Sequence, residues 1–419
     1  MNPPVFTGDQ CLKCNICLTA CPVSAIADCF PGPKTVGPQA QRFRLSDEPI
    51  AERSLEYCSG CGLCSLACPQ GVPIAEINTL AKAAQTRRYG LALRNRLLGR
   101  SEWLGRIGSR LTPLSNILLH NNVLRLIGEI VLGISRQAPL PHFAPQTFRA
   151  WYAARAPEAV FSRQPTTIPP PSPAQPTVVY FHGCSVNYYE PEIGRAAVRV
   201  LELNGYRVIV PPQKCCGLPL QSNGELEAAR AYAAANIRWL APYAYAGYPI
   251  LGTSSSCTLM LKRYYRTILG LDGEAVEAVA QATEDICEFL GKLAAAGRLN
   301  TTLRPWPQKA AYHAACQLRS HGIGLPALEL LSYIPNLEVI PTLTDCCGIA
   351  GTYGLKVEKY ALAQAIGQAT FAAIRASGAT CVVCDSETCR WWLGHHTGLP
   401  TKHPIEILAA AYDSKATGG

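Results

Sequence analysis

Short apolar runs alternate with longer segments rich in alanine and leucine throughout the second half of the chain. A run such as 177–181 (TVVYF) has the length and the β-branched and aromatic content of a buried strand. The segments 225–241 and 357–377 are long and apolar enough to form helices that cover such strands. This alternation predicts small α/β units.

The same order of elements and cysteines occurs twice in this half. The intervals between successive cysteines are 31, 1 and 41 residues in the first copy and 30, 1 and 42 in the second. Agreement of this kind indicates an internal repeat, for which two units related by a pseudo-twofold axis are the simplest architecture. The cysteines are expected on loops at the strand ends. They are Cys184, Cys215, Cys216 and Cys257 in the first copy, and Cys316, Cys346, Cys347 and Cys389 in the second.

Between 113 and 134 the apolar residues follow a helical period. The stripe consists of Val123, Ile127, Ile130, Val131 and Ile134. Arg125 and Glu129 lie off it, and the middle of the segment is too polar to cross a bilayer, which needs about 20 apolar residues. Such a helix lies on a membrane surface or packs on a neighbouring domain, and the pattern alone allows both.

A strongly basic stretch precedes this segment. Between 81 and 110, Glu102 is the single acid, and the basic residues are Lys82, Arg87, Arg88, Arg94, Arg96, Arg100, Arg106 and Arg110. A basic stretch suits nucleic acid, anionic lipid or an acidic partner, or is simply a solvated helical face. Aromatic residues do not alternate with the basic ones, which disfavours nucleic acid. The apolar stripe that follows favours a membrane surface.

Length and composition indicate a folded protein of several domains. The chain has 419 residues, of which 48% are hydrophobic and 16% charged, so a largely disordered chain is excluded. Residues 163–177 contain six prolines and are predicted to form an extended linker. The predicted division is a cysteine-rich domain (1–98), a basic and amphipathic helical region (99–162), the linker (163–177), and the two repeats (178–305 and 306–419).

Twenty cysteines are too many for packing alone and require a chemical explanation. Disulfides, zinc and iron-sulfur clusters are the candidates. The start, MNPPVFTGDQ, lacks the basic and apolar regions of a signal peptide, so we expect a protein of the reducing cytoplasm, where disulfides are rare.

Nine cysteines lie in the first 68 residues, and eight of them form two runs of C-x2-C-x2-C-x3-C-P. Three thiolates of such a run wrap one 4Fe-4S cluster, while the fourth reaches the other cluster. Zinc has no need of the third cysteine or of the Cys-Pro step, and remains the weaker alternative. The expected ligands are Cys11, Cys14, Cys17 and Cys68 for one cluster, and Cys58, Cys61, Cys64 and Cys21 for the other.

In the repeats, adjacent cysteines bind one zinc only with strain but can hold two irons of a cluster, so one or two further iron-sulfur clusters are expected there. Gly217 and Gly348 follow the pairs and let the backbone approach a cluster or adopt positive φ. His182 and His313 precede the first cysteine of each copy at unequal offsets, which favours a supporting or core role over ligation. Four cysteines are left as structural residues: Cys29, Cys287, Cys381 and Cys384.

Several motifs together resemble a known family. They are PGPK between the two runs, FRAWY at 148–152, FHGCSVNYYEP, KCCGLPL, TSSSC, CCGIAGTYG and SETCRWW. The chain is similar over nearly its whole length to the iron-sulfur subunits, designated C, of anaerobic glycerol-3-phosphate dehydrogenases. Its second half also resembles the Cys-Cys-Gly subunits of heterodisulfide reductase, glycolate oxidase and lactate-utilisation complexes. The resemblance implies an α+β multidomain fold: an N-terminal α-helical ferredoxin-like domain with two 4Fe-4S clusters, followed by two tandem α/β Cys-Cys-Gly repeats.

The resemblance further implies an electron-transfer subunit without catalytic residues of its own. It would bind FAD-containing catalytic subunits, lie peripherally on the cytoplasmic face of the inner membrane, and deliver electrons to menaquinone in anaerobic respiration. The chain has no glycine-rich nucleotide motif, so no flavin or nucleotide is expected on it. The alternatives are the iron-sulfur subunit of a glycolate or lactate oxidase and a catalytic subunit of the heterodisulfide reductase kind.

One position departs from the family pattern. Relatives end the second copy with C-E-T-C, whereas this chain has Ser386 in place of the first of those cysteines, matched by Ser254 in the first copy. A serine alkoxide is a poor iron ligand, so a cluster with five thiol ligands in each copy is put in doubt, and so is the catalytic alternative.

Overall fold

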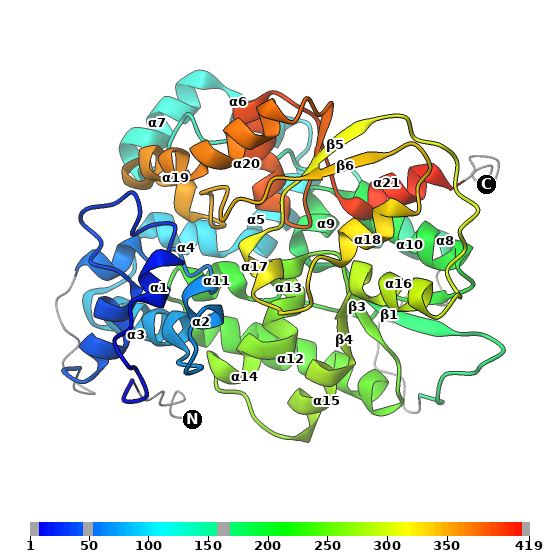
Figure 1. Ribbon diagram of the computed structural model, residues 1–419, viewed down its shortest axis with the longest axis horizontal. Helices are drawn as coiled ribbons and strands as arrows, with labels where there is room; N and C mark the ends of the chain where they lie inside the picture. Colours follow the sequence, from blue (N-terminus) through cyan, green and yellow to red (C-terminus); the bar gives the residue numbers. More distant parts are fainter. Residues whose placement is uncertain (1–7, 45–52, 157–167, 413–419) are drawn as a thin grey trace.

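The computed structural model describes residues 8–44, 53–156 and 168–412 (Figure 1). Short helical turns and one long helix, separated by loops, form the first part, which carries the two cysteine runs. Its elements are α1 (Ile16–Thr19), the π-helical turn η1 (Thr35–Gln39), the 3-10 turn η2 (Arg53–Tyr57), α2 (Leu63–Leu66) and α3 (Ile74–Tyr89). Five helices follow: α4 (Leu93–Gly99), α5 (Ser101–Arg110), α6 (Leu114–His120), α7 (Asn122–Leu132) and α8 (Phe148–Arg155).

The second half contains two four-stranded sheets with the same topology. Strand order is β2-β1-β3-β4 in one and β6-β5-β7-β8 in the other, and every pairing is parallel. The first sheet consists of β1 (Thr177–Phe181), β2 (Arg207–Ile209), β3 (Ile250–Gly252) and β4 (Thr283–Asp285). The second consists of β5 (Lys309–Tyr312), β6 (Glu338–Pro341), β7 (Cys381–Val383) and β8 (Thr401–Lys402). The predicted tandem α/β repeat is confirmed.

Helices connect the strands, as parallel sheets require. In the first repeat they are α9 (Gly183–Tyr188), α10 (Pro191–Leu203), α11 (Leu218–Ser222), α12 (Leu226–Tyr245), α13 (Ser255–Leu259), η4 (Met260–Tyr264), α14 (Tyr265–Thr267), α15 (Glu274–Ala282) and α16 (Ile286–Ala295). In the second they are α17 (Cys316–Arg319), α18 (Pro326–Ser332), η5 (Tyr353–Leu355), α19 (Val357–Ala376), α20 (Glu387–Thr397) and α21 (Pro404–Ala411). The segments predicted to be long helices are α12 and α19.

The two repeats share one hydrophobic core. Buried residues of β1, β5 and β7 and of the helices between them form a single cluster. A buried ion pair crosses the same boundary, because Arg390 of α20, 2% exposed, donates to the Glu190 carboxylate at 2.7 Å. Arg390 also donates to the carbonyl of Cys384 at 2.9 Å. The two repeats therefore form one folded unit rather than two independently packed domains.

The segment predicted as one amphipathic helix forms two, α6 and α7. Asn121 adopts an extended conformation between them, and its side chain accepts hydrogen bonds from the amides of Val123 and Leu124, which caps α7. The apolar stripe faces outward, with Ile130 76% and Val131 72% exposed. Among the described residues, no other part of this chain covers Val123, Ile127, Ile130 or Val131.

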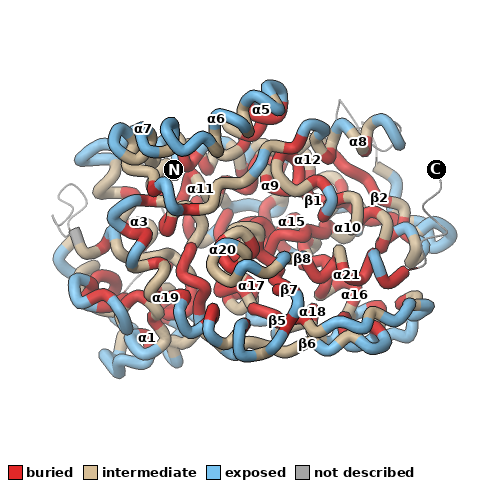
Figure 2. Tube along the Cα trace, turned by 90° about the horizontal axis from the view of Figure 1, so that it is seen from above, coloured by how far each residue is buried: buried red, intermediate tan, exposed pale blue. Residues whose placement is uncertain are grey.

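The polar side of α7 faces the protein instead. Arg125 donates to the carbonyls of Ser135 and Ala138, which ties α7 to the chain that follows it. Figure 2 shows α5, α6 and α7 along one edge of the molecule, with α6 and α7 in the colours of exposed and intermediate residues. No helix among the described residues is both long and apolar enough to cross a membrane.

Some arginines of the basic stretch form ion pairs with other parts of the chain. Arg94 of α4 makes a bidentate ion pair with Glu358 of α19, at 2.7 and 2.9 Å. Arg100 pairs with Glu225 at 3.1 Å. These arginines join the first part of the chain to both repeats, as does Glu76 of α3, which is 1% exposed and pairs with Arg263 at 2.6 Å.

The helical region and the linker are not separate from the first repeat. Phe148 and Tyr152 of α8 are buried, and the Tyr152 hydroxyl donates to the carbonyl of Val208 in β2 at 2.8 Å. Within the predicted linker, residues 163–167 lie outside the described residues. Further on, the Tyr248 hydroxyl donates to the carbonyl of Pro169 at 2.9 Å. This part of the linker packs on the repeat.

Candidate iron-sulfur sites

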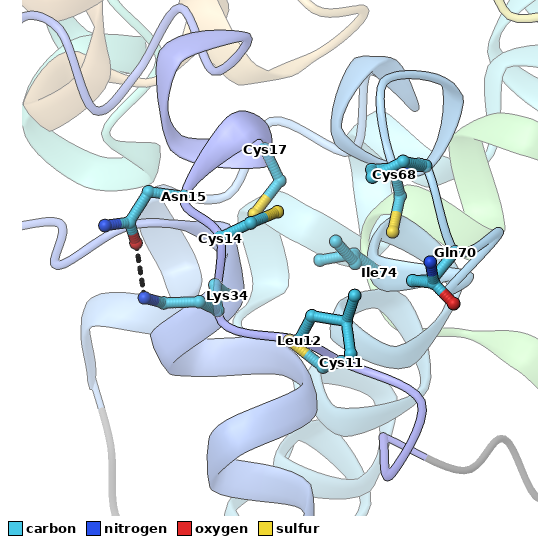
Figure 3. Close-up of a pocket in the computed structure, with 10 residues that line it drawn as sticks. Cys11, Leu12, Cys14, Asn15, Cys17, Lys34, Cys68, Gln70 and Ile74 are labelled. Carbon is cyan, nitrogen blue, oxygen red and sulfur yellow. Dashed lines mark hydrogen bonds between the residues drawn. The ribbon is translucent and has the colours of Figure 1, made fainter.

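The first ferredoxin-type site combines three cysteines of the first run with one of the second. Cys11, Cys14, Cys17 and Cys68 line one pocket, and Figure 3 shows Cys68 facing the other three across it. Lys34 also lines the pocket and hydrogen-bonds to the side chain of Asn15. Cys14 is exposed, whereas burial raises the pKa of Cys17. This site lies close to the surface.

The second ferredoxin-type site is the reciprocal set, Cys58, Cys61, Cys64 and Cys21, which lines a separate pocket. It is more enclosed, because none of its four cysteines is exposed. This burial raises the pKa of Cys61 to about 12 and raises that of Cys64 as well. The Asn78 amide lies 3.9 Å from the Cys58 sulfur. The fold thus brings together the two crossed groups of four that the sequence predicts, although ligation itself is a proposal.

In the repeats the cysteines gather at the carboxyl ends of the parallel strands. The first Cys-Cys-Gly site comprises Cys184 on α9, Cys257 on α13, and the pair Cys215 and Cys216 in the loop after β2. The Cys184 and Cys215 sulfurs lie 3.4 Å apart. Hydrogen bonds from Cys184 and Cys216 lower the pKa of Cys215, so this thiol most readily becomes the thiolate that iron requires.

Two buried side chains fix this loop. The Cys215 amide donates to the Glu102 carboxylate of α5 at 2.8 Å. Asn236 of α12 accepts from the Lys214 amide at 2.7 Å and donates to the Cys215 carbonyl at 3.2 Å. The sequence singles out Glu102 only as the one acid of the basic stretch and does not single out Asn236, because their role is recognisable only once α5 and α12 are seen to pack on the loop.

The second Cys-Cys-Gly site comprises Cys316 on α17, Cys389 on α20, and the loop pair Cys346 and Cys347. Cys316 and Cys346 have sulfurs 3.4 Å apart. Hydrogen bonds from Cys316 and Cys347 lower the pKa of Cys346. The repeats therefore reproduce the same thiol arrangement, except that four of the eight cysteines lie on helices rather than on the predicted loops.

A fifth thiol joins the second site. Cys384, at the end of β7, is completely buried and hydrogen-bonds to the Cys389 thiol. The sequence groups Cys384 with the structural cysteines, and this contact makes it a further candidate ligand of the second site. Gly252 occupies the matching place in the first repeat, five residues before Cys257, so that site has no equivalent. Ser386 also hydrogen-bonds to Cys389, whereas the Ser254 hydroxyl accepts from the Cys257 amide at 3.4 Å and caps α13.

The remaining predicted residues lie as follows. Cys287 and Cys381 are buried and Cys29 is exposed. His313 is fully buried and hydrogen-bonds to Thr342 at 3.3 Å. His182 lies beside Gly183, with Nδ1 2.6 Å from that residue's carbonyl oxygen.

The donor sets suit iron-sulfur clusters. Every donor is a thiol, and backbone amides donate toward the sulfurs, as from Gly348 to Cys346 at 3.3 Å. A Cβ on Gly183 would lie only 3.0 Å from the Cys257 sulfur, so glycine keeps that space open. Among residues 8–44, 53–156 and 168–412, no group of three or more His, Cys, Asp or Glu side chains is arranged to hold a single metal ion.

The second ferredoxin-type site and the second Cys-Cys-Gly site are in direct contact. The Ser320 hydroxyl, at the end of α17, lies 3.0 Å from the Cys61 carbonyl and 2.9 Å from that of Cys316. Cys21, Cys58 and Cys61 belong to one hydrophobic cluster with Cys316 and Cys346.

The two Cys-Cys-Gly sites approach each other through α13 and α17. His321 lies just after α17. Its Nε2 forms a hydrogen bond with the Thr258 hydroxyl at 3.2 Å and lies 2.9 Å from the carbonyl oxygen of Ser255. Ser254 also hydrogen-bonds to Glu387 of the second repeat at 3.1 Å.

Comparison with known proteins fits this arrangement. Residues 7–72 match a family model described as a 4Fe-4S dicluster domain, and 178–262 and 310–394 each match the cysteine-rich CCG domain. In Escherichia coli (strain K12), the subunit designated C of anaerobic glycerol-3-phosphate dehydrogenase is 36% identical over 416 residues, which cover 98% of this chain and 100% of the relative. The chain belongs to the family of this dehydrogenase component.

Other relatives match this chain at lower identity. In Methanothermobacter marburgensis, the subunit designated B of fumarate reductase (CoM/CoB) is 26% identical, over 91% of this chain and 66% of the relative. Lactate utilization protein A 2 of Bacillus cereus (strain Q1) is 29% identical, over 43% of this chain and 74% of the relative. The chain is thus a homologue of the glycerol-3-phosphate dehydrogenase iron-sulfur subunit that is also similar to a fumarate reductase subunit and to a lactate utilization protein.

Proposed function

We propose that this chain carries electrons from a flavin in partner subunits to a quinone, through iron-sulfur clusters held at its four cysteine sites. A bound cluster supplies single-electron transfer, and a flavin in the partner converts a two-electron oxidation into single steps. The substrate of the partner would be glycerol 3-phosphate, as the name of the E. coli relative suggests. The chain itself would be a non-catalytic subunit of the oxidoreductase.

The contact at Ser320 carries this proposal. It places the second ferredoxin-type site against the second Cys-Cys-Gly site, and α13 and α17 bring the first Cys-Cys-Gly site next to that. The two ferredoxin-type sites also adjoin, because Cys17 and Cys64 belong to one hydrophobic cluster. The four cysteine sites thus follow one another in contact, which an electron relay needs and a set of independent structural metal sites does not. The proposed order runs from the first to the second ferredoxin-type site, then to the second and the first Cys-Cys-Gly sites.

The proposed entry point is the first ferredoxin-type site. Its loop exposes Cys14 and the apolar side chain of Leu12, 68% exposed, and Ile16 and Phe43 add to the exposed apolar surface of this part of the chain. An apolar surface beside a shallow cysteine site fits a docking face for the flavin-containing partner.

The proposed membrane contact is the outer face of α6 and α7. Its exposed apolar side chains lie beside the exposed Arg106 and Arg110 of α5, a combination that binds anionic lipid surfaces. The chain would therefore sit peripherally on the cytoplasmic face of the inner membrane. Flotation with anionic vesicles tests this contact with the double variant Ile130→Asp/Val131→Asp.

Buried apolar side chains contribute roughly 1.5–3 kcal/mol each, so the double variant should bind vesicles at least about tenfold more weakly. Leu343→Asp is the control, because Leu343 is 88% exposed but lies in the second repeat. Equal binding by the double variant and the control would contradict the membrane contact.

The function as a whole is tested by low-temperature EPR of anaerobic membranes from the native organism, with a deletion strain as blank. Glycerol 3-phosphate should produce iron-sulfur signals that are missing in the deletion strain. If only lactate or glycolate produces them, the relay is right and its donor is wrong. If none of the three substrates does, the proposed function fails.

A further inference from the structure

A cavity opens on the first Cys-Cys-Gly site. Its volume is about 300 Å³, and α5, α8, α9, α12 and the loop after β2 surround it. Cys184 and Cys215 form part of its wall. Small-molecule sites in proteins are typically about 300–1,000 Å³. A small molecule inside would therefore lie against two of the cysteines proposed to hold the last cluster of the relay.

The cavity is lined by more cations than anions. The cations are Arg106, Arg149, Lys214 and Arg238, and the one carboxylate is Glu102. That carboxylate is already engaged, because it accepts from the Cys215 amide at 2.8 Å and pairs with Lys214 at 3.3 Å and Arg106 at 3.6 Å. The excess positive charge of the cavity wall therefore favours a molecule that is negative or becomes negative when it is reduced.

The other wall residues suit a flat ring with polar edges. Trp239, Tyr188 and Ala235 offer aromatic and apolar surface. His182, 95% buried, also lines the cavity; because its Nδ1 hydrogen-bonds to the Gly183 carbonyl, it donates there, and Nε2 is an acceptor buried without a partner. A hydroxyl group on a ligand would satisfy that acceptor.

The cavity lies beside the proposed membrane contact. Glu102 and Arg106 of α5 line it, while Trp103 and Ile107 of the same helix are exposed and continue into the apolar face of α6 and α7. Figure 2 shows α5, α6 and α7 along one edge of the molecule. A lipid-soluble molecule could therefore reach the cavity from the membrane surface.

We propose that this cavity is the acceptor site, where the ring of a lipid-soluble quinone binds and is reduced beside Cys184 and Cys215. The inference rests on the proposed function, which supplies the electrons. Two electrons arrive singly through the iron-sulfur relay from the partner's flavin, two protons enter from solvent, and both quinone carbonyls become hydroxyls. The cations offset the negative charge that the ring gains with each electron.

The test is a pair of variants on α12. Ala235 lines the cavity and Ala234, its neighbour, is exposed and does not. Ala235→Phe places a phenyl ring in the cavity, and Ala234→Phe adds the same ring to the surface. The full chain with its clusters is reduced with dithionite and mixed with a methylated naphthoquinone that lacks a lipid tail. Stopped-flow absorbance of the oxidised clusters then gives the reoxidation rate at several quinone concentrations.

Wild type and Ala234→Phe should show the same saturable rate, and Ala235→Phe should lose at least about tenfold of it at unchanged iron content, a factor equivalent to 1.4 kcal/mol. If Ala235→Phe matches Ala234→Phe while the wild type saturates, the cavity is not the acceptor site. If the quinone does not oxidise the wild type at all, the proposed function fails instead.

A charge variant provides a second, independent measurement. Lys214→Gln/Arg106→Gln should raise the half-saturating quinone concentration about threefold to tenfold, since partly exposed charges contribute up to about 1 kcal/mol each. Lys292→Gln is its control, because Lys292 is also a half-exposed lysine paired with glutamates but lies on α16. An unchanged half-saturation in the double variant would overturn the role given to the cations.

Discussion

The glycines that follow the two cysteine pairs differ in what surrounds them, and this difference is testable. Gly217 has φ +92° and Gly348 has φ +97°. An alanine in this left-handed region costs about 1–2 kcal/mol at either position. A Cβ at Gly217 would meet atoms of Ala229 at an ordinary 3.4 Å. At Gly348 it would lie 1.9 Å from the backbone oxygen of Ala363 in α19, which has to move.

Overpacking of this kind costs about 1–3 kcal/mol more, so Gly348→Ala should be the more destabilising variant by that amount. With an unfolding entropy of about 2.1 cal/mol/K per residue, the melting temperature of a chain of 419 residues shifts by roughly 1 °C per kcal/mol, so that of Gly348→Ala should lie about 1–3 °C below that of Gly217→Ala. Calorimetry of the anaerobically purified chain measures both shifts. Iron analysis adds a second readout, because the displaced loop carries Cys346 and Cys347.

The result that would refute this reasoning is a Gly217→Ala variant that is destabilised as much as Gly348→Ala. In that case positive φ alone, rather than the approach of α19, would set the requirement for glycine. Equal iron loss in both variants would point the same way.

Other expectations concern ligation and charge. Cys68→Ser should change the EPR spectrum in the same way as substitution of Cys11, Cys14 or Cys17. Cys21→Ser should change it in the same way as substitution of Cys58, Cys61 or Cys64. The reverse pattern would exclude crossed ligation. Cys384→Ala should alter the EPR signal and iron content of the second Cys-Cys-Gly site, while Cys381→Ala, in the same strand, should not. Burial lowers the pKa of Lys356 to about 7, below its unfolded value of about 10.4, so this lysine destabilises the fold most below about pH 7 and least above about pH 10. Lys356→Met should therefore raise the melting temperature at about pH 7, with a gain that shrinks toward about pH 10; a pH-independent gain would contradict the assignment.

Much of this protein follows from local spacing. Three thiolates three residues apart wrap one cluster, so the two C-x2-C-x2-C-x3-C-P runs determine both the kind of site and its crossed grouping. The matching cysteine intervals likewise predict the tandem repeat, because each interval is the length of chain between the ends of neighbouring strands. These features depend on residues close in sequence, where spacing and geometry are directly related.

Other features depend on contacts between distant segments. The sequence could not say which way the apolar stripe of α7 faces, because that depends on Arg125 binding the carbonyls of Ser135 and Ala138. Spacing alone grouped Cys384 with the structural cysteines, whereas the end of β7 brings its thiol to Cys389.

The sequence by itself determined the type and number of candidate cysteine sites, because thiol chemistry and short-range spacing are written into it. Only the tertiary structure decided how those sites are ordered in space. The contact of Ser320 with Cys61 joins residues 259 positions apart. The cavity beside Cys184 likewise requires α5, α8 and α12 to meet, and no local pattern encodes how helices from different parts of a chain pack together.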